Sequence, residues 1–466
     1  MGTLWGSFYI GLRSLNASQT GLSVTGNNIA NVNTPGYSRQ HAVLTEALSI
    51  RTAVGAMGTG VDVQSVLAIR DRFLEYRLVQ QGPQQGREET LSAALSAVEA
   101  VFNETQTSGI QSAMSAFFSA YSALASQPEN MSLRTDVLTK AQQMAALFRS
   151  HSAALEEVQL GSDRAVSSIV SDINALTAQI ADLNQEVVQM ESGSIPSAND
   201  LRDQRDELVR QLSKMVNIAV TETENGAVTI SAGSGRLLVA GNRSYDLTAV
   251  AQPPSGFKNI FSGTTDITAE ITGGTLAGNI LARDTYVPAY LSQLDTLAAQ
   301  VGSDVNALHT TGYGMNNLTG FDFFVPWVGP VTGAAAAFDV DPAIVADVNR
   351  IATGSAINQP GNNDIATQMA DLATALNMSG GTASYSNYYA NLTFNVGEDL
   401  SRATDNLEIE SAILTQLQNQ RDAVSAVSLD EEAAAMIQFQ RQYQAGAQFL
   451  RVIDDLTEFV INTFGS

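Results

Sequence analysis

Residues 26–38 read GNNIANVNTPGYS and separate a stretch with helical spacing from one that reads as extended chain. Pro35 presets φ for the second position of a tight turn, and Gly36 tolerates the positive φ that a type II turn needs at the third. Because Thr34 precedes a proline, it is driven out of the helical region, so the helix must end before it. This turn motif comprises Asn27, Asn28, Asn31, Asn33, Thr34, Pro35, Gly36 and Tyr37. We interpret it as a structural corner whose asparagines hydrogen-bond within or between subunits.

The composition excludes several classes of protein. Lys and Arg number 24 against 47 Asp and Glu in 466 residues, a net charge of −23 (24 − 47), which argues against a nucleic-acid partner. The absence of cysteine excludes disulfides and thiolate chemistry. No apolar run approaches the ~20 residues that cross a bilayer, so no membrane insertion is expected. The first residues lack the charged region of a cleaved secretory signal, so export would need a dedicated route.

Both ends of the chain show helical spacing. Over residues 4–30, large apolar residues recur every seven positions at Phe8, Leu15, Leu22 and Ile29. Over residues 429–464, apolar residues step by threes and fours at Met436, Phe439, Tyr443, Leu450, Ile453 and Val460. A solitary helix with so thin a seam is marginal in water. The two ends also differ mildly in charge, so we expect these helices to pair with each other or with copies of the chain.

The middle of the chain changes period twice. Residues 166–190 carry eight apolar positions in coiled-coil spacing, and residues 199–215 supply a matching antiparallel helix. Residues 216–275 alternate and contain Asn225-Gly226, which predicts β-hairpins. The expected fold is mainly α with an inserted β domain. We predict an axial coiled coil formed by residues 1–40 and 428–466. A mainly helical core comprises residues 41–215 and 277–427, with an extended segment at 41–80. An outer β-rich domain comprises residues 216–276, with part of 311–341 as an optional addition.

Sites for catalysis, cofactors and metals are not predicted. The histidines His41, His151 and His309 lie far apart and lack metal-ligand spacing. No phosphate-binding glycine loop, dinucleotide fingerprint or nucleophile elbow is present. The acidic run Asp430–Glu432 is typical of a helix N-terminus, where the macrodipole favours negative charge. A paired-carboxylate glycosidase is left open by sequence alone, but a non-enzymatic protein is favoured.

Several motifs carry a family resemblance. Residues 27–37 resemble the N-terminal signature of bacterial flagellar axial proteins, which build the rod, the hook and the hook–filament junction. Further agreement comes in order from Ser38-Arg39-Gln40, Asp203-Gln204-Arg205-Asp206, Leu429-Asp430-Glu431-Glu432 and Tyr443-Gln444-Ala445. Thr34-Pro35 stands where hook and distal-rod members more often have Thr-Thr, which favours the junction member. The chain is short for this family, so its outer surface is the part that the resemblance covers least.

The resemblance implies a structural role in flagellum assembly and motility. The protein would be an adaptor, a homo-oligomeric ring at the junction of hook and filament. Its partners would be copies of itself, the flagellar hook protein, a second junction protein and an export chaperone on the C-terminal helix. It would be extracellular, exported unfolded through the flagellar type III apparatus without a cleaved signal. Two alternatives stay open: a hook or distal-rod subunit, and a secreted coiled-coil binding or adhesion module.

Overall fold

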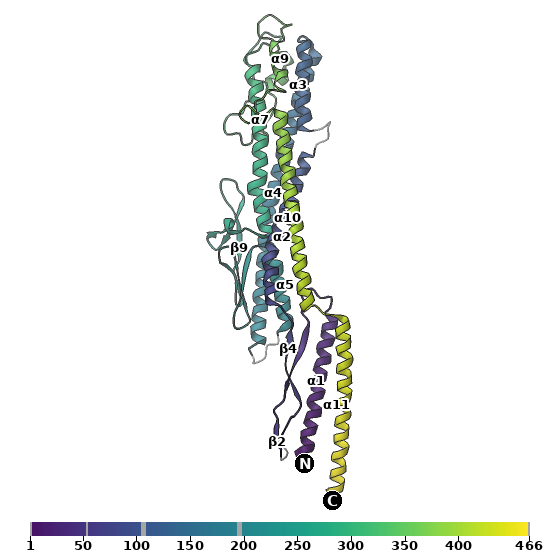
Figure 1. Ribbon diagram of the computed structural model, residues 1–466. Helices are drawn as coiled ribbons and strands as arrows, with labels where there is room; N and C mark the ends of the chain where they lie inside the picture. The colour runs from purple at the N-terminus through teal and green to yellow at the C-terminus, as the bar shows by residue number, and fades with distance from the viewer. Residues whose placement is uncertain (1, 53–54, 104–108, 193–197, 465–466) are drawn as a thin grey trace. The chain divides into compact units, whose positions relative to one another are not determined.

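The computed structural model describes residues 2–52, 55–103, 109–192 and 198–464 (Figure 1). The chain divides into two compact units. The first unit comprises Met1–Gly86, Ile169–Gly274 and Ile409–Ser466, and the second comprises Arg87–Ser168 and Thr275–Glu408. None of the described helices is long and apolar enough to cross a membrane.

The first unit contains the two terminal helices. Helix α1 (Gly2–Ala30) packs along α11 (Leu429–Phe464), and the two lie side by side with both chain ends at the same end of the pair (Figure 1). The unit also holds α5 (Asn199–Met215), the start of α2 (Arg72–Phe102), and the ends of α4 (Met131–Met190) and α10 (Tyr385–Ser425).

Three groups of strands complete the first unit. Strands β1 (Gln40–Glu46) and β4 (Val61–Ala68) form a long antiparallel hairpin, extended by β2 (Ile50–Thr52) and β3 (Gly55–Met57). A four-stranded sheet has the order β5-β6-β7-β8, and a three-stranded sheet has the order β11-β10-β9. Their bounds are β5 Ile218–Glu222, β6 Val228–Ala232, β7 Arg236–Ala240, β8 Arg243–Ser244, β9 Leu247–Ala251, β10 Lys258–Ser262 and β11 Thr265–Asp266, followed by the short helix η1 Thr268–Glu270.

The second unit is a helical bundle around one apolar core. Its elements are α3 (Ile110–Ser126), α6 (Gly274–Leu281), the π-helical turn η2 (Ala282–Tyr286), α7 (Val287–His309), α8 (Pro342–Ala346), η3 (Val348–Arg350) and α9 (Asp364–Asp371), with parts of α2, α4 and α10. Phe117, Phe323 and Phe324 are fully buried at its centre, with ring centroids 4.9–5.7 Å apart. Edge-to-face and tilted aromatic pairs of this kind add to the free energy gained from burial.

His309 is a satisfied core residue of the second unit. Its Nδ1 lies 2.6 Å from the carbonyl oxygen of Phe321, and its Nε2 accepts the amide proton of Ala352 at 2.9 Å. This pattern requires a neutral ring with its proton on Nδ1. Burial lowers the pKa of His309 to about 4, an effect that nearby Arg134 strengthens and that the Phe321 carbonyl and Asp341 oppose.

The structure differs from the sequence expectation at several points. Helix α2 begins at Arg72, whereas the chain was expected to be extended to about residue 80. Gly82 and Pro83 lie inside this helix and do not interrupt it. Between 342 and 384, α8, η3 and α9 are short helices joined by irregular chain, where mostly continuous helix was expected. Residues 311–341 lie in the second unit, whereas the β strands of 218–266 lie in the first, so the optional grouping of the two is corrected.

Candidate functional site: the corner between the terminal helices

The turn motif forms a closed local network. Helix α1 ends at Ala30, the Tyr37 amide donates to the Thr34 carbonyl at 3.2 Å, and Gly36 has φ of 79° as the type II turn requires. Asn31 donates through Nδ2 to the backbone and side-chain oxygens of Asn27 at 3.0 and 2.9 Å. The helix end is thereby held by its own side chains.

Asn28 connects this turn to the distant C-terminal helix. Its side chain is 1% exposed, and its Oδ1 accepts from the Tyr37 hydroxyl and the Gln40 amide, both at 2.9 Å. Its Nδ2 donates to the Gln40 carbonyl at 2.8 Å and to Glu432 Oε2 at 3.1 Å. Every donor and acceptor of the amide is therefore used.

Glu432 and Glu431 at the start of α11 are paired with Arg39. Arg39 Nε donates to Glu432 Oε1 at 2.7 Å, and its Nη1 to Glu431 Oε2 at 2.6 Å. Glu432 is almost fully buried, so removing its partner would leave an uncompensated charge. The backbone amide of Arg39 also donates to the Ser425 carbonyl at the end of α10. Arg39 thus ties the connection between α10 and α11 to the turn.

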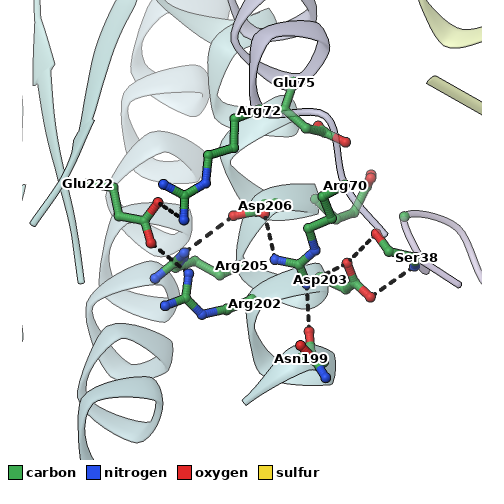
Figure 2. Close-up of polar contacts among 12 residues, drawn as sticks. Ser38, Arg70, Arg72, Glu75, Asn199, Arg202, Asp203, Arg205, Asp206 and Glu222 are labelled. Carbon is green, nitrogen blue, oxygen red and sulfur yellow. Dashed lines mark hydrogen bonds and ion pairs between the residues drawn. The ribbon is translucent and has the colours of Figure 1, made fainter. Parts of the chain in front are cut away.

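Ser38 fastens the turn to α5 (Figure 2). Its amide and hydroxyl donate to the two carboxylate oxygens of Asp203 at 2.9 and 2.7 Å. Arg70 Nη2 contacts the same carboxylate at 2.8 Å and the Asn199 carbonyl at 2.8 Å. Burial raises the pKa of Asp203, and the Arg70 cation and Ser38 donors oppose that shift. Burial, followed by the nearby carboxylates of Asp200, Asp203 and Glu432, raises the pKa of Tyr37.

A third arginine, Arg421 of α10, completes the corner. Arg421 Nη2 donates to the Gly36 carbonyl at 2.8 Å, and Arg421 Nε lies 3.2 Å from Glu75. Glu75 also pairs with Arg210 of α5. We call the turn motif, residues 38–40 and these partners the corner. Five segments from distant parts of the chain meet in it: 27–40, 70–75, 199–210, 421–425 and 431–432.

The helix pair below the corner uses a different line of α1 from the expected seam. Leu15, Leu22 and Ile29 are half-buried and Phe8 is exposed, whereas Gly11, Ser18, Gly21, Thr25 and Asn28 are buried. A Cβ at Gly21 would lie 2.5 Å from Phe439 Cε1, and one at Gly11 would lie 2.5 Å from Leu450 Cδ2. Small residues on α1 therefore receive the large side chains of α11.

Much of the α11 seam packs toward α1 in the structure. Ile453 is buried, and Met436, Phe439, Leu450 and Val460 are half-buried, whereas Tyr443 is 41% exposed. Gly446 of α11 is buried against Leu15 and Ser14. The pair still leaves large apolar side chains uncovered, at Trp5, Phe8, Tyr9, Leu12, Ile437, Phe449, Val452, Leu456, Phe459 and Ile461. Exposed apolar side chains gathered on one helix pair indicate an interaction surface.

Among the described residues, no group of three or more His, Cys, Asp or Glu is placed to hold a metal ion. A groove of about 610 Å³ beside the turn is lined by Thr34 and Pro35 together with the carboxylates of Asp182, Glu186, Asp200, Asp203 and Glu207. Asn33 and Pro35 are exposed on the turn. Sequence reasoning missed Arg70, Glu75 and Arg421, because no local pattern indicates that residues so far apart share a network.

The comparisons with known proteins agree with this arrangement. The family model "Flagella basal body rod protein" matches residues 8–37, and "Flagellar basal body rod FlgEFG protein C-terminal" matches residues 418–463. These two segments supply both terminal helices and much of the corner, which places the protein in the class of flagellar axial proteins. The model "Flagellar hook-associated protein FlgK helical domain" matches residues 95–324.

Full-length relatives narrow the class to one family. A Bacillus subtilis protein named flagellar hook-associated protein 1 is 32% identical over 97% of both chains. A protein of the same name from Salmonella typhimurium is 25% identical over 97% of this chain and 98% of the relative. The chain belongs to the flagellar hook-associated protein 1 family and is a structural component of the bacterial flagellum. The solved flagellar hook junction protein FlgK from Burkholderia pseudomallei shares the fold at 16% identity, with a TM-score of 0.68 over 75% of this chain and 100% of that one.

Proposed function

We propose that copies of this chain form the ring that joins the hook to the filament, as a non-enzymatic adaptor. The observation that carries the proposal is the corner, in which the buried Asn28, Asp203 and Glu432 side chains fix the terminal helix pair to the rest of the first unit. An adaptor between two tubes has to transmit force without bending at its own joints. Buried, fully satisfied polar networks of this kind rigidify a structure.

The uncovered apolar surface of the helix pair supports assembly through these helices. Trp5 and Tyr9 of α1 and Phe459 of α11 are more than half exposed in the single chain. Large apolar side chains exposed together in an isolated chain are normally covered by partners. We assign copies of the chain, the hook protein and a second junction protein as those partners. We assign the extracellular flagellum as the location of the protein, which it reaches without a cleaved signal peptide.

Deleting residues 2–30 tests the proposal in motile cells. The shortened protein should keep its second unit folded, but the flagella should lack the ring and the cells should release unattached flagellin into the medium. A second variant, Trp5→Ser with Tyr9→Ser and Leu12→Ser, keeps the buried line of α1 and removes only exposed apolar side chains. It should fold with α1 paired and still fail to assemble. Normal filaments in both variants would refute the proposal.

The apolar seam of α11 supports a dedicated export chaperone for this segment. Met436, Phe439 and Ile453 have to be shielded from water whenever α1 does not cover them. Pull-down from the native host with the full chain and with a chain truncated after residue 428 tests this assignment. A chaperone captured equally by both would contradict it.

One alternative is a hook or distal-rod subunit, because rod-protein models match both ends of the chain. The similarity to hook-associated protein 1 over 97% of both chains favours the junction instead. Antibody labelling of isolated hook–basal bodies separates the two positions. A label confined to the boundary of hook and filament supports the adaptor, whereas a label along the hook or rod supports the alternative.

A further inference from the structure

The first unit contains a second cavity, of about 570 Å³, between β4, α2, α5 and the β5–β6 hairpin. We call it the arginine pocket. Arg70, Arg72, Arg202 and Arg205 line it (Figure 2). The carboxylates of Glu75, Glu191, Asp206 and Glu222 and apolar side chains that include Val209 and Val228 complete the lining. Ion pairs join most of these groups, and Arg72 is the arginine whose side chain is most exposed.

Arg205 is buried in this pocket with an unused donor. Its side chain is 2% exposed, and its Nη1 donates to the Gly226 carbonyl at 2.7 Å and to Asn184 Oδ1 at 3.2 Å. Its Nε has no hydrogen-bond partner among the described residues, and the buried Nε of Arg70 has none either. A buried donor without an acceptor is costly.

The mouth of the pocket is basic and aromatic. The Arg72 side chain is 82% exposed and lies 3.4 Å from Glu222, a carboxylate that Arg202 already holds at 2.6 Å. Beside it on α2, Phe73 and Tyr76 are exposed, and the Arg77 guanidinium lies 5.9 Å above the Phe73 ring. Glu75, which also lines the pocket, is neutralised by Arg210 and Arg421. The mouth therefore offers cations and aromatic surface to a segment that is both acidic and apolar.

The outer face of α11 has this chemistry. Val452, Asp455, Leu456 and Phe459 follow one another at steps of three, one and three, so they form one exposed stripe that borders the line of Ile453 and Val460. In its own chain α11 is held along α1 by the glycine contacts and the corner. The stripe is therefore available to another molecule.

Charge distinguishes this stripe from the other uncovered apolar segments. The hairpin tip exposes Leu48 and Ile50, but Arg51 stands beside them and would meet the arginines of the mouth. The exposed face of α1 lies in residues 1–45, which contain no Asp or Glu. Only α11 combines large apolar side chains with carboxylates among these described segments.

We propose that the arginine pocket receives the outer stripe of α11 from a second copy of this chain. Phe459 enters the apolar side of the pocket, and Asp455 pairs with Arg72 at its mouth. The contact is heterologous, so it links copies in a closed ring or an open series. It rests on the proposed function, because it needs copies to stand next to each other in the flagellum.

Cysteine cross-linking tests the contact without background, because the chain has no cysteine of its own. Chains carrying both Tyr76→Cys and Phe459→Cys are expressed in motile cells, and isolated flagella are treated with a short bismaleimide. We expect a ladder of cross-linked copies, whereas either single variant should give none. Co-expression of the two single variants should give dimers only. Flagella that contain the protein at the junction but yield no ladder would overturn the contact while leaving the proposed function intact.

Two other outcomes also decide the matter. A cross-link from Tyr76→Cys to a different flagellar protein, found by mass spectrometry with a cysteine introduced there, would overturn the assignment of a second copy as the occupant. Absence of the protein from the flagella would contradict both the contact and the proposed function. Circular dichroism of the purified cysteine variants checks that they fold.

A charge exchange tests the electrostatic part. Arg72→Glu with Arg77→Glu should lower the cross-linking yield at least tenfold, and adding Asp455→Lys with Glu458→Lys should restore most of it. The control Lys140→Glu with Arg243→Glu makes the same change of charge elsewhere and should leave the yield unchanged. Loss without restoration, or equal loss in the control, would overturn the pairing.

Discussion

Asn28 shows how a single amide can hold a corner. It sits between the Tyr37 hydroxyl, the Gln40 backbone and the Glu432 carboxylate, and it satisfies all of them. A buried polar residue at a helix–helix contact also fixes the relative register of the two helices. Its contribution therefore lies in specificity as much as in stability.

Replacing Asn28 tests this role. Asn28→Ala leaves the Gln40 amide and one oxygen of Glu432 without their partner, so we expect the free energy of unfolding to fall by about 2–4 kcal/mol. Chemical denaturation of the full chain measures it. Asn33→Ala is the matched control, because Asn33 is exposed on the same turn, and it should change stability by less than about 0.5 kcal/mol. Equal losses in the two variants would contradict the assignment.

His309 predicts a pH dependence of stability. Its folded pKa is about 4, below the ordinary value of 6.5, so folding favours the neutral ring. The stability it contributes is present above pH 6.5 and is lost as the pH falls from 6.5 through about 4, by about 3 kcal/mol at the lower end. Denaturation curves between pH 7 and 4 measure the loss.

The controls for this dependence are other histidine variants. His309→Gln should be less stable at pH 7 and should lack this part of the acid dependence. His41→Gln alters an exposed ring and should follow the parent chain at every pH. An unchanged pH slope in His309→Gln would show that another group causes the loss.

At the scale of elements, glycines set the approach of α1 to α11. A matched pair of substitutions isolates that effect. Gly26→Ala meets nothing within 4 Å, so it should raise the stability of α1 by about 0.5–1 kcal/mol through helix propensity. Gly21→Ala has the same propensity gain, but its Cβ would meet the Phe439 ring, so the gain should be cancelled or reversed. Hydrogen exchange of α11 amides near residue 439 measures the difference, and equal protection in both variants would contradict the close contact.

The elements also show which patterns a sequence reveals. Large apolar residues mark the α11 seam in the sequence. In α1 the buried line consists of small residues such as Gly11 and Gly21, which hydrophobic spacing does not detect. In α4 the buried positions include Val166 and Ile173 as predicted, but also the polar Thr177 and Asn184. The Thr177 hydroxyl donates to the Asn174 carbonyl one turn earlier in the helix, and the Asn184 amide donates to the Val228 carbonyl of β6. Local periodicity predicts that a helix has a buried face, and tertiary contacts decide its exact edge.

At the scale of the whole molecule, the corner could be predicted only in part. The turn itself follows from Pro35 and Gly36, and the family resemblance indicated the segments of Asp203 and Glu432. Their meeting could not be derived, because Ser38 and Asp203 lie 165 positions apart and Asn28 and Glu432 lie 404 apart. Contacts at such separations are decided by the fold as a whole.

Truncation after residue 428 tests the dependence of one end on the other. Without α11, the buried line of α1 and Arg39 lose their partners, so α1 should become a site of rapid proteolysis. The second unit contains neither end and serves as the internal control, since its fragments should persist as in the full chain. Limited proteolysis with mass spectrometry of the fragments measures both. Cleavage of α1 at an unchanged rate would contradict the pairing.

The antiparallel pairing of α1 with α11 has a consequence for how the molecule comes into being. During synthesis on a ribosome, or passage through any narrow channel, one helix emerges hundreds of residues before the other. The first can close onto its partner only when the last segment has been delivered. A chain that is interrupted before α11 therefore leaves the buried line of α1 exposed to solvent. This exposed line distinguishes it from chains in which α1 and α11 have paired.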